Sequence, residues 1–379
     1  MYNDIIIGCG FAGAVMAERL AAAGRKILMI DRRNHIGGNC YDAKDQYGVL
    51  IHVYGPHIFH TSDKGVYEYL SAFTKWNEYS HEVVAKVGEN YIPVPFNLNT
   101  LKTAFPDKAK ALEKKLTDTY GMDTKVPILK LRESEDEDIR MIADYVYNNI
   151  FLKYTMKQWG QTPEEIDPSV TGRVPVYISY DNRYFQDTYQ GMPSDGFTPM
   201  FEKMLDNDNI TVELGLDAKD VLSFRDGNVY YKNEIFHGNV IYSGQIDELF
   251  DNKYGMLPYR TLNFVTEHYD CDGVLPKAVV NYTVSEDYTR ITEYKKLTWQ
   301  ECEGTTIMKE YSLSYDGEKT QTPYYAIINQ ENLTLYNKYK AEADRYKNLY
   351  MLGRLAEYKY YNIDGIVRRA LNLADKITG

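Results

Sequence analysis

A glycine motif near the first residue constrains the fold more than any other feature of this chain. Residues 4–7 form a short apolar run, a Gly-x-Gly-x-x-Gly motif spans residues 8–13, and an alanine-rich stretch continues to Ala23. This order predicts a strand, a tight turn and a helix, the arrangement that binds a dinucleotide. The first glycine permits the turn, the second lets the backbone approach a pyrophosphate, and the third lets the helix pack on the strand. The free N–H groups and positive dipole end of that helix favour bound phosphate.

The next segment adds an acidic residue and a second glycine clause. Residues 26–30 form another apolar run that ends in Asp31, where a carboxylate can accept hydrogen bonds from an adenosine ribose. Arg33 follows, and Gly37 and Gly38 come shortly after it. This clause resembles the extension found in flavoproteins that bind FAD rather than in NAD dehydrogenases. We therefore predict FAD as the cofactor.

Composition and charge limit the partners. The chain has 379 residues, enough for two or three domains, and a formal net charge of −11. This charge argues against general binding to nucleic acid or an anionic membrane, and no apolar run is long enough for a membrane-spanning helix. The four cysteines are scattered without metal-binding spacing, so we predict free thiols and no metal site. Because no targeting signal is recognisable, we expect a cytoplasmic protein.

The apolar patterns predict an α/β fold class with three regions. A strand that ends before Ser243 and Gly244, and a terminal helix with apolar residues at helical spacing, return to the dinucleotide-binding unit. We predict a discontinuous Rossmann-like FAD-binding domain, a small helical domain and an antiparallel β-sheet domain. The predicted ranges are 1–75, 200–250 and 345–379 for the FAD-binding domain, 97–172 for the helical domain with a mobile substrate lid near 165–180, and 76–96, 174–199 and 251–344 for the antiparallel sheet.

Further motifs, taken together, are similar to those of the UDP-galactopyranose mutase family. Individually they are weak: paired histidines such as His57 and His60 are more often structural, and Trp159 by itself is more often packing at a helix end. Their combination spans nearly the whole chain and is specific. The motifs are Asn34–Asn39, Tyr54-Gly55, His57–Thr61, Lys157–Gly160, Arg173–Val176, Tyr189–Gly191, Tyr288–Arg290 and Gly353–Tyr361.

This resemblance implies a flavoenzyme that interconverts UDP-galactopyranose and UDP-galactofuranose without net redox change. It implies that FAD is active when reduced and that its N5 atom attacks the anomeric carbon and displaces UDP. A flavin-iminium intermediate then lets the sugar ring open and close again before UDP returns. The resemblance also implies a homodimer, an electron donor such as NAD(P)H or a reductase, and a place in cell-wall polysaccharide biosynthesis.

The resemblance also assigns roles to individual residues. Arg173 and Arg290 match the two arginines that bind the pyrophosphate, where a planar guanidinium can stabilise the leaving UDP. His60 matches a catalytic histidine beside the flavin and the sugar. The implied substrate-binding residues are Tyr154 and Trp159 at the uridine, Tyr184, Tyr325 and Tyr360 at the phosphates, Asn281 near the diphosphate, and Asn362 near the sugar. The implied cofactor-binding residues are Gly8, Gly10, Phe11, Ala12, Gly13, Asp31, Arg32, Gly38, Asn39, His57, Arg354, Tyr361 and Ile363.

Two departures from the family pattern keep alternatives open. Asp31 stands where many members have Glu, and Asn362 stands where Asp is expected, which leaves the natural sugar open. The same chemistry on another UDP-sugar, such as UDP-N-acetylgalactosamine, is one alternative. An FAD-dependent oxidoreductase of the amine-oxidase type is a second, and a catalytically silent UDP-sugar-binding module is a third.

Overall fold

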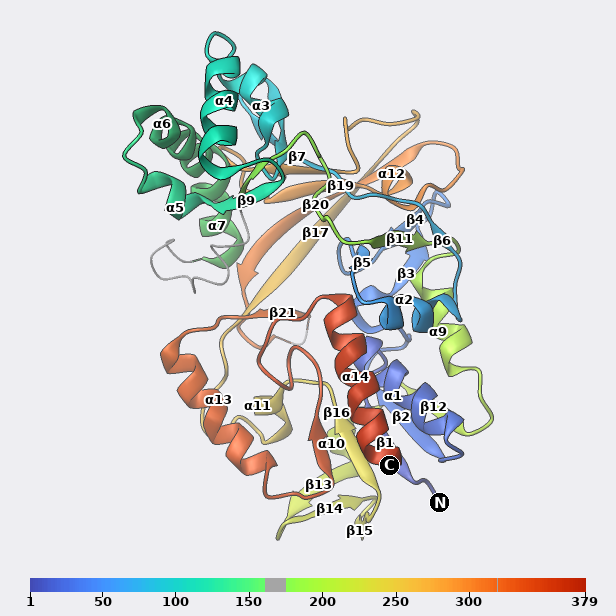
Figure 1. Cartoon of the computed structure of the whole chain (residues 1–379). Helices are drawn as coiled ribbons and strands as arrows, with labels where there is room; N and C mark the ends of the chain where they lie inside the picture. The colour runs from blue at the N-terminus through green and yellow to red at the C-terminus, as the bar shows by residue number, and fades with distance from the viewer. Residues whose placement is uncertain (161–174, 319) are drawn as a thin grey trace.

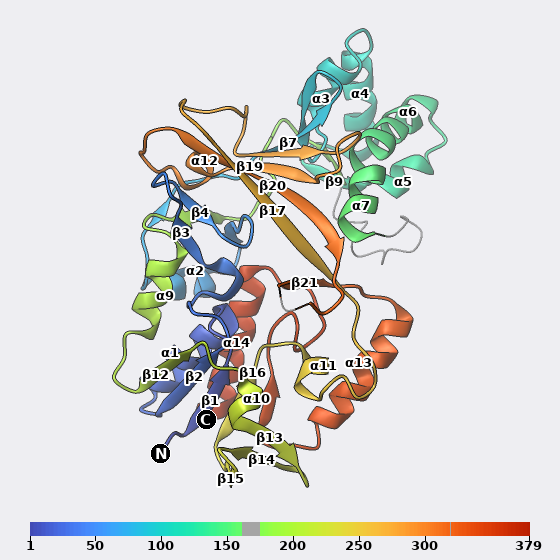
Figure 2. The same cartoon turned by 180° about the vertical axis from the view of Figure 1, so that it is seen from behind.

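The computed structural model describes residues 1–160, 175–318 and 320–379. The molecule is elongated, with a Rossmann-like region at one end, a helical region at the other and a large sheet between them (Figures 1 and 2). Both termini lie close together in the Rossmann-like region (Figure 1). The chain therefore leaves this region, builds the rest of the molecule and returns.

The Rossmann-like region is built on a parallel sheet with the strand order β12-β2-β1-β16-β22. Its central strands read as continuous apolar runs because both faces of the sheet are covered. In the first strand, Ile6 packs on one face, and Ile5 and Ile7 pack on the other. The strands are β1 (Asp4–Ile7), β2 (Ile27–Asp31), β12 (Ile210–Leu214), β16 (Asn239–Tyr242) and β22 (Leu349–Met351).

Helices cover both faces of this sheet (Figure 1). One face carries α1 (Phe11–Ala22), α9 (Phe197–Leu205) and α14 (Ile363–Thr378). The other carries α11 (Ile246–Leu249) and α13 (Gln330–Ala343). A short helix, α10 (Ala218–Val221), and a small antiparallel sheet extend the second face. The sheet consists of β13 (Leu222–Arg225), β14 (Asn228–Tyr231) and β15 (Glu234–Ile235). The predicted Rossmann-like fold class is confirmed.

The central sheet has the strand order β21-β17-β20-β19-β18-β7-β8. It is antiparallel except between β18 and β7, which run parallel, so the predicted antiparallel sheet contains one parallel pair. A parallel pair is possible here because β7 and β18 are not joined by a hairpin, which would force them antiparallel. The strands are β7 (Val83–Val87), β8 (Asn90–Val94), β17 (Tyr259–Tyr269), β18 (Val279–Tyr282), β19 (Arg290–Glu293), β20 (Thr305–Ser314) and β21 (Pro323–Ala326), and α12 (Tyr294–Thr298) follows β19.

The helical region packs at the end of the central sheet, around an apolar cluster that also includes residues of β7, β8 and β18. The acidic run that precedes α6 supplies Asp136, whose carboxylate caps the helix by accepting from the N–H groups of Asp138 and Ile139. A π-helical turn, Tyr147–Phe151, joins α6 to the last helix. The elements are α3 (Leu98–Ala104), α4 (Ala109–Tyr120), β9 (Thr124–Pro127), α5 (Ile128–Arg132), α6 (Glu137–Val146) and α7 (Leu152–Trp159).

Short strands connect the three regions. The strand β10 (Pro175–Ile178) pairs with β9 of the helical region, and β11 (Tyr189–Pro193) lies between β5 and β6. Neither joins the central sheet, although residues 174–199 are predicted to contribute to it, because their backbone groups pair with β9, β5 and β6 instead. The remaining elements are β3 (Asp42–Lys44), β4 (Leu50–His52), β5 (Phe59–Thr61), α2 (Lys64–Ser71) and β6 (Trp76–Asn77).

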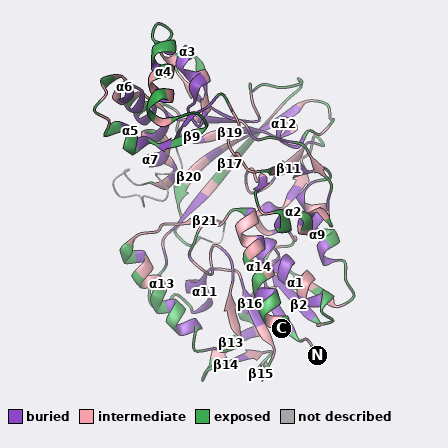
Figure 3. Cartoon of the chain, in the orientation of Figure 1, coloured by how far each residue is buried: buried purple, intermediate pink, exposed green. Residues whose placement is uncertain are grey.

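Buried residues gather where the sheets meet their covering elements, and exposed residues follow the outer sides of helices such as α13 (Figure 3). Within the residues that the structure describes, no helix is long and apolar enough to cross a membrane. The same residues contain no group of three or more His, Cys, Asp or Glu side chains arranged to hold a metal ion.

Candidate active site

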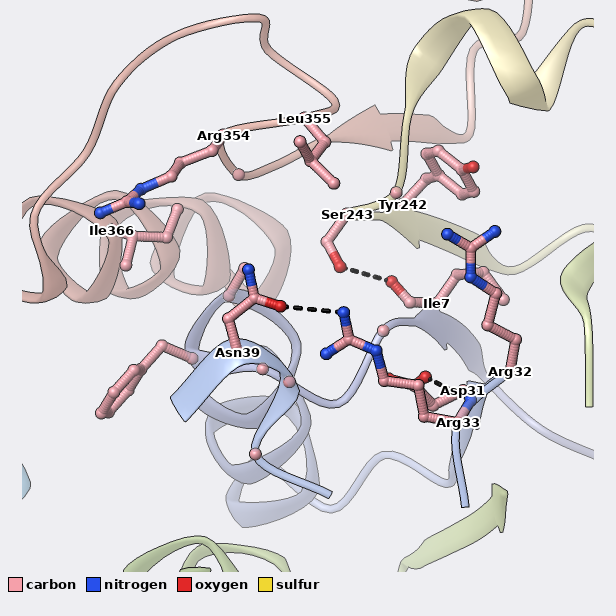
Figure 4. Close-up of a pocket in the computed structure, with 18 of the residues that line it drawn as sticks. Ile7, Asp31, Arg32, Arg33, Asn39, Tyr242, Ser243, Arg354, Leu355 and Ile366 are labelled. Carbon is pink, nitrogen blue, oxygen red and sulfur yellow. Dashed lines mark hydrogen bonds between the residues drawn. The ribbon is translucent and has the colours of Figure 1, made fainter. Parts of the chain in front are cut away.

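A pocket of about 250 Å³ lies at the carboxyl ends of β1, β2 and β16, beside the start of α1. Figure 4 shows its lining, with Asp31, Arg32 and Arg33 on one side and Arg354 and Ile366 on the other. The first residue before α1 is Gly10, and no side chain caps the helix. The N–H groups of its first turn are therefore left for a ligand, which suits a phosphate.

The glycine motif is required by close approaches between backbone segments. Gly8 has φ +100°, and a Cβ atom there would lie 2.1 Å from Ser243 Oγ. A Cβ atom on Gly13 would lie 1.9 Å from the carbonyl oxygen of Gly8, so α1 can pack on its strand only through glycine. A Cβ atom on Gly38 would lie 2.8 Å from Gly10 Cα. The segments 8–13 and 37–38 are thus in contact, and together their backbones form one cradle.

Asp31 sits between these segments and is already partly engaged. Its carboxylate accepts the backbone N–H of Cys9 at 2.8 Å and that of Arg33 at 2.9 Å. It still lines the pocket, so the remaining lone pairs can accept from a ribose. Arg32 donates to both carboxylate oxygens of Glu248, at 2.9 and 3.0 Å, so its charge is compensated within the protein.

Arg33 completes this side of the pocket, although the predicted list of cofactor-binding residues omits it. Its guanidinium donates to Asn39 Oδ1 at 2.9 Å and lies 4.3 Å from the ring centre of Tyr54. The dashed contact to Asn39 is visible in Figure 4. All predicted cofactor-binding residues line the pocket except Gly13, which instead allows α1 to pack.

A second, larger cleft of about 720 Å³ lies between the first pocket and the central sheet. The two share one wall, formed by His57, Arg354, Tyr361, Asn362 and Ile363. This wall includes the residue before α14 and the first residue of that helix, so the positive end of the helix dipole faces the junction. A ligand that fills both spaces would have its two parts in contact here.

Arg290 is the cation that the central sheet presents to the cleft. Its Nε and Nη2 atoms contact the same carboxylate oxygen of Glu310, at 2.8 and 2.7 Å. Burial opposes the charge on Arg290, but the adjacent Glu310 carboxylate holds its pKa well above the ordinary range. Asn281 lies directly opposite Arg290 in the β18–β19 register, so both side chains occupy one face of the sheet. A fixed charge and an amide therefore stand together in the cleft.

Aromatic side chains line the cleft around this cation. The ring of Tyr325 lies 5.8 Å from that of Trp159 and 6.3 Å from that of Tyr360. Burial raises the pKa of Tyr325 to about 12, so its hydroxyl stays a donor at neutral pH. Arg354 lies 4.5 Å from the ring centre of Tyr360. Tyr154 and Tyr184 also line the cleft, whereas Trp159 lies beside it and is not among the described lining residues.

Hydrogen bonds at the end of α7 set the position of Trp159. The Nζ atom of Lys157 donates to the carbonyl groups of Tyr282, Glu286 and Tyr288. Arg260 donates to the carbonyl groups of Lys157 and Gln158 at 3.3 and 3.2 Å. These bonds tie the helical region to the central sheet and hold Trp159 near the cleft.

His60 lies on β5 and faces the cleft from the Rossmann-like side. Its Nδ1 atom is 2.8 Å from Asp187 Oδ2, and the hydroxyl of Ser62 donates to the other oxygen of that carboxylate at 2.8 Å. The imidazole stacks on Phe185 with ring centres 3.5 Å apart. These contacts fix the plane of the imidazole, and among the described residues no hydrogen bond occupies its Nε2 atom.

Asn362 stands immediately before α14, and its side chain makes no capping hydrogen bond. It lines both pockets. Asp364 lies in the first turn of the same helix and accepts from Thr61 Oγ1 at 3.2 Å. A carboxylate thus remains at this edge of the cleft even though position 362 carries an uncharged amide.

The structure therefore brings most predicted substrate residues together. Arg173 lies outside the described residues, as does most of the predicted lid. Other lining residues were not predicted as site residues, because neighbours in the same segments carried the resemblance or because, as for His81 and Lys125, no motif includes them. They include His81, Lys125, Phe185, Tyr324 and Asp364.

Comparisons with known proteins bear on this geometry. A sequence profile described as UDP-galactopyranose mutase matches residues 149–360, and one described as an NAD(P)-binding Rossmann-like domain matches residues 6–73. A probable UDP-galactopyranose mutase of Klebsiella pneumoniae is 38% identical over 99% of this chain and 94% of its own length. The chain belongs to the UDP-galactopyranose mutase family.

One further relative is named for another nucleotide-sugar, and one similar protein has a solved structure. A dTDP-fucopyranose mutase of Escherichia coli is 36% identical and covers 99% of this chain and 98% of its own length. A crystal structure of reduced UDP-galactopyranose mutase covers 100% of this chain and 94% of its own, with 16% identity and a TM-score of 0.72. The latter supports the fold.

Family membership makes the chain an isomerase of the mutase type and FAD its cofactor. The first pocket fits this flavin dinucleotide: its glycine cradle admits a pyrophosphate where any Cβ atom would intrude, and the uncapped start of α1 faces it. The resemblance seen in the sequence is confirmed, and the amine-oxidase and silent-module alternatives lose their support.

Proposed function

We propose that this family member interconverts UDP-galactopyranose and UDP-galactofuranose while FAD remains reduced. The observation that carries the proposal is the wall shared by the two pockets. A nucleotide-sugar whose pyrophosphate contacts Arg290 could extend its sugar to this wall, where the reactive end of the cofactor would meet it. The similarity to UDP-galactopyranose mutases supports the same reaction.

In this proposal Arg290 acts when the bond between the anomeric carbon and the nucleoside diphosphate breaks. Negative charge then grows on the diphosphate, and a fixed cation stabilises it more strongly as the bond breaks than before. Glu310 holds the guanidinium in place, so little reorganisation is needed during the reaction. Bound reduced FAD supplies the nucleophile for the anomeric carbon.

The other predicted residues complete the same proposal. Arg173 acts as the second cation, Asn281 contacts the diphosphate, and His60 lies beside the sugar. The hydroxyl groups donated to the phosphates come from Tyr184, Tyr325 and Tyr360. Tyr154 and Trp159 bind the uridine, and this remote binding orients the anomeric carbon.

A second candidate substrate is dTDP-fucopyranose. The relative of that name is nearly as similar to this chain as the first mutase, at 36% against 38% identity. Asn362 lines the shared wall with an amide where an acid is expected, which fits a change in the sugar hydroxyl groups that are recognised. UDP-N-acetylgalactosamine remains the alternative among UDP-sugars.

A substrate panel tests these proposals directly. Holoenzyme reduced with dithionite is incubated separately with UDP-galactofuranose, dTDP-fucopyranose and UDP-N-acetylgalactosamine, and products are separated by chromatography. We expect UDP-galactofuranose to give UDP-galactopyranose with the highest kcat/KM. If only dTDP-fucopyranose turns over, the second candidate replaces the first. If no nucleotide-sugar in the panel turns over, the proposed function is wrong.

The proposal also includes the localisation, oligomeric state and electron donor of the enzyme. We propose a cytoplasmic homodimer that receives electrons from NAD(P)H or a reductase and serves cell-wall polysaccharide biosynthesis, as the family resemblance implies. The predicted domain ranges belong to the same proposal, except 174–199, whose strands β10 and β11 do not join the central sheet. Sedimentation of the holoenzyme at several concentrations tests the dimer, and a mass equal to one chain throughout would exclude it.

A further inference from the structure

His81 lies in the cleft but has no part in the function proposed above. It precedes β7, lines the cleft and is only 4% exposed. Its ring centre is 5.8 Å from that of Tyr184 and 5.9 Å from that of Phe185, the residue that stacks on His60. His81 therefore stands within the wall of the cleft next to the groups expected to meet the diphosphate and the sugar.

The side chain behind His81 is Tyr79. Its hydroxyl is 2.9 Å from His81 Nδ1, and Tyr79 is itself only 5% exposed. Burial raises the pKa of Tyr79, so the phenol keeps its proton. Burial lowers the pKa of His81 to about 3, an effect to which nearby Arg290 and His60 add, so the imidazole is neutral. A neutral imidazole carries its proton on one nitrogen only.

The contact with Tyr79 decides which nitrogen that is. If Nδ1 carried the proton, it would donate to the Tyr79 oxygen, and the phenol proton would need another acceptor. Among the described residues, Tyr79 Oη has no other recorded hydrogen bond. If the phenol donates to Nδ1, the phenol proton and the Nδ1 lone pair are both used, as is the rule for buried polar groups, and among the described residues the N–H on Nε2 has no protein acceptor. The proton of His81 then resides on Nε2.

We propose that Tyr79 is a positioning residue that fixes His81 as the Nε2–H tautomer, so that His81 donates a hydrogen bond to an oxygen atom of the bound nucleotide-sugar. The substrate contact rests on the proposed function, whereas the tautomer does not. The acceptor is a phosphate oxygen or a sugar hydroxyl near Arg290. Because Nδ1 accepts from Tyr79 and Nε2 is protonated, His81 serves as a donor and not as a general base.

The tautomer is tested without substrate. Holoenzyme labelled with ¹⁵N only in histidine is examined by long-range ¹H–¹⁵N NMR, and the His81 signals are identified by their loss in His81→Gln. We expect a pyrrole-like Nε2 and a pyridine-like Nδ1. In Tyr79→Phe, which removes one hydroxyl, the two shifts should move toward each other as the tautomers mix. A wild-type signal with the proton on Nδ1, or no change in Tyr79→Phe, overturns the proposal.

The contact with the ligand is tested by binding. His81→Gln retains an N–H donor near the position of Nε2, whereas His81→Leu removes it at similar size. We expect His81→Leu to bind UDP-galactopyranose about tenfold more weakly than the wild type, and His81→Gln to restore most of the affinity. The same loss for UDP assigns the acceptor to a phosphate, and a loss confined to UDP-galactopyranose assigns it to the sugar. Unchanged affinity in His81→Leu overturns the substrate contact.

The NMR experiment tests the tautomer of His81, and the binding experiment tests its contact with the ligand, so the two claims can fail separately. If the panel of nucleotide-sugars fails, the NMR result on ligand-free holoenzyme still decides the role of Tyr79. A double variant, Tyr79→Phe with His81→Gln, adds a further check, because Tyr79 acts only through His81. We expect it to bind UDP-galactopyranose as His81→Gln does; an additional loss of more than about threefold would show that Tyr79 acts by another route.

Discussion

The cofactor pocket and the substrate cleft are neighbours that share a wall, yet they are assembled in different ways. The pocket depends on backbone shape within a short stretch, since residues 8–13 and 37–38 form its cradle by touching one another. The cleft depends on side chains from strands and helices far apart in the sequence, such as His60, Arg290 and Asn362. Local backbone requirements can be deduced from sequence patterns. Which side chains far apart in the sequence lie close together in the fold cannot be deduced from those patterns.

The same difference predicts how each part fails. A change in the cradle should displace the cofactor, because the backbone segments have no room to move apart. A change in the cleft should leave the cofactor bound and alter only the steps that involve the nucleotide-sugar.

The largest effect is expected for Gly13→Val. A side chain at this position would begin 1.9 Å from the carbonyl oxygen of Gly8, so α1 would have to separate from its strand. We expect no bound FAD and a mostly insoluble protein, measured as flavin absorbance per chain after purification. Gly24→Ala is the control at the other end of α1: its Cβ meets nothing within 4 Å, and its φ of +80° should cost only about 1 kcal/mol of stability. Stoichiometric FAD in Gly13→Val would contradict the account of the cradle.

Arg290→Lys should show the next largest effect. It keeps a positive charge beside Glu310 but loses the planar guanidinium, so the fold and FAD content should persist. We expect kcat to fall by about 10²–10³-fold, the range for removing a preorganised charge-stabilising donor. Arg290→Ala should be at least as impaired but also leaves Glu310 buried without its partner, so FAD content must be checked first. Near-normal kcat in Arg290→Lys would remove the guanidinium from the proposed mechanism.

A smaller effect is expected for Trp159→Ala. If its ring holds the base, UDP should bind more weakly by about 1–3 kcal/mol, measured by titration calorimetry with the holoenzyme. Trp299→Ala is the matched control, because Trp299 is 55% exposed and lies outside both pockets. An unchanged dissociation constant for UDP would leave Trp159 with a packing role against Tyr325.

The last expected effect, a change in the slope that a single histidine contributes, concerns acid stability. Burial lowers the pKa of His52, His57 and His81 to about 3, so below pH 6.5 the unfolded chain binds protons that the folded chain does not. Stability should be constant with respect to these groups above pH 6.5 and fall as the pH drops toward 3, by up to about 1.4 kcal/mol per pH unit for each histidine. In His81→Gln the decline of the unfolding midpoint between pH 6.5 and 5 should be shallower. An identical decline would show that His81 is charged or accessible in the folded state.

The sequence predicted the part of the fold that follows from local rules. The Gly8–Gly13 motif, the apolar runs of β1 and β2 and the helical spacing of α14 each require a particular backbone, and the structure has them. The parallel pairing of β7 with β18 was out of reach, because no turn links the two strands and nothing local states which edge each strand meets.

The site was predicted unevenly for the same reason. Arg290 and Asn281 emerged only through the family resemblance, although their opposition across β18 and β19 is what joins them physically. Glu248 was missed as the partner of Arg32, because an ion pair between residues so distant in sequence leaves no periodic trace. His81 and Tyr79 lie in a short segment without a motif, so only burial and the 2.9 Å contact reveal their pairing.

The most direct test of the central claim is to count product molecules per reduced flavin. Holoenzyme is reduced without excess reductant under anaerobic conditions, mixed with a large excess of UDP-galactofuranose, and followed by flavin absorbance and by chromatography of the nucleotide-sugars. We expect many molecules of UDP-galactopyranose per flavin, no lasting oxidation of the flavin, and no product from the oxidised enzyme. Product formed in proportion to flavin oxidised, or equal turnover by the oxidised enzyme, would contradict the central claim.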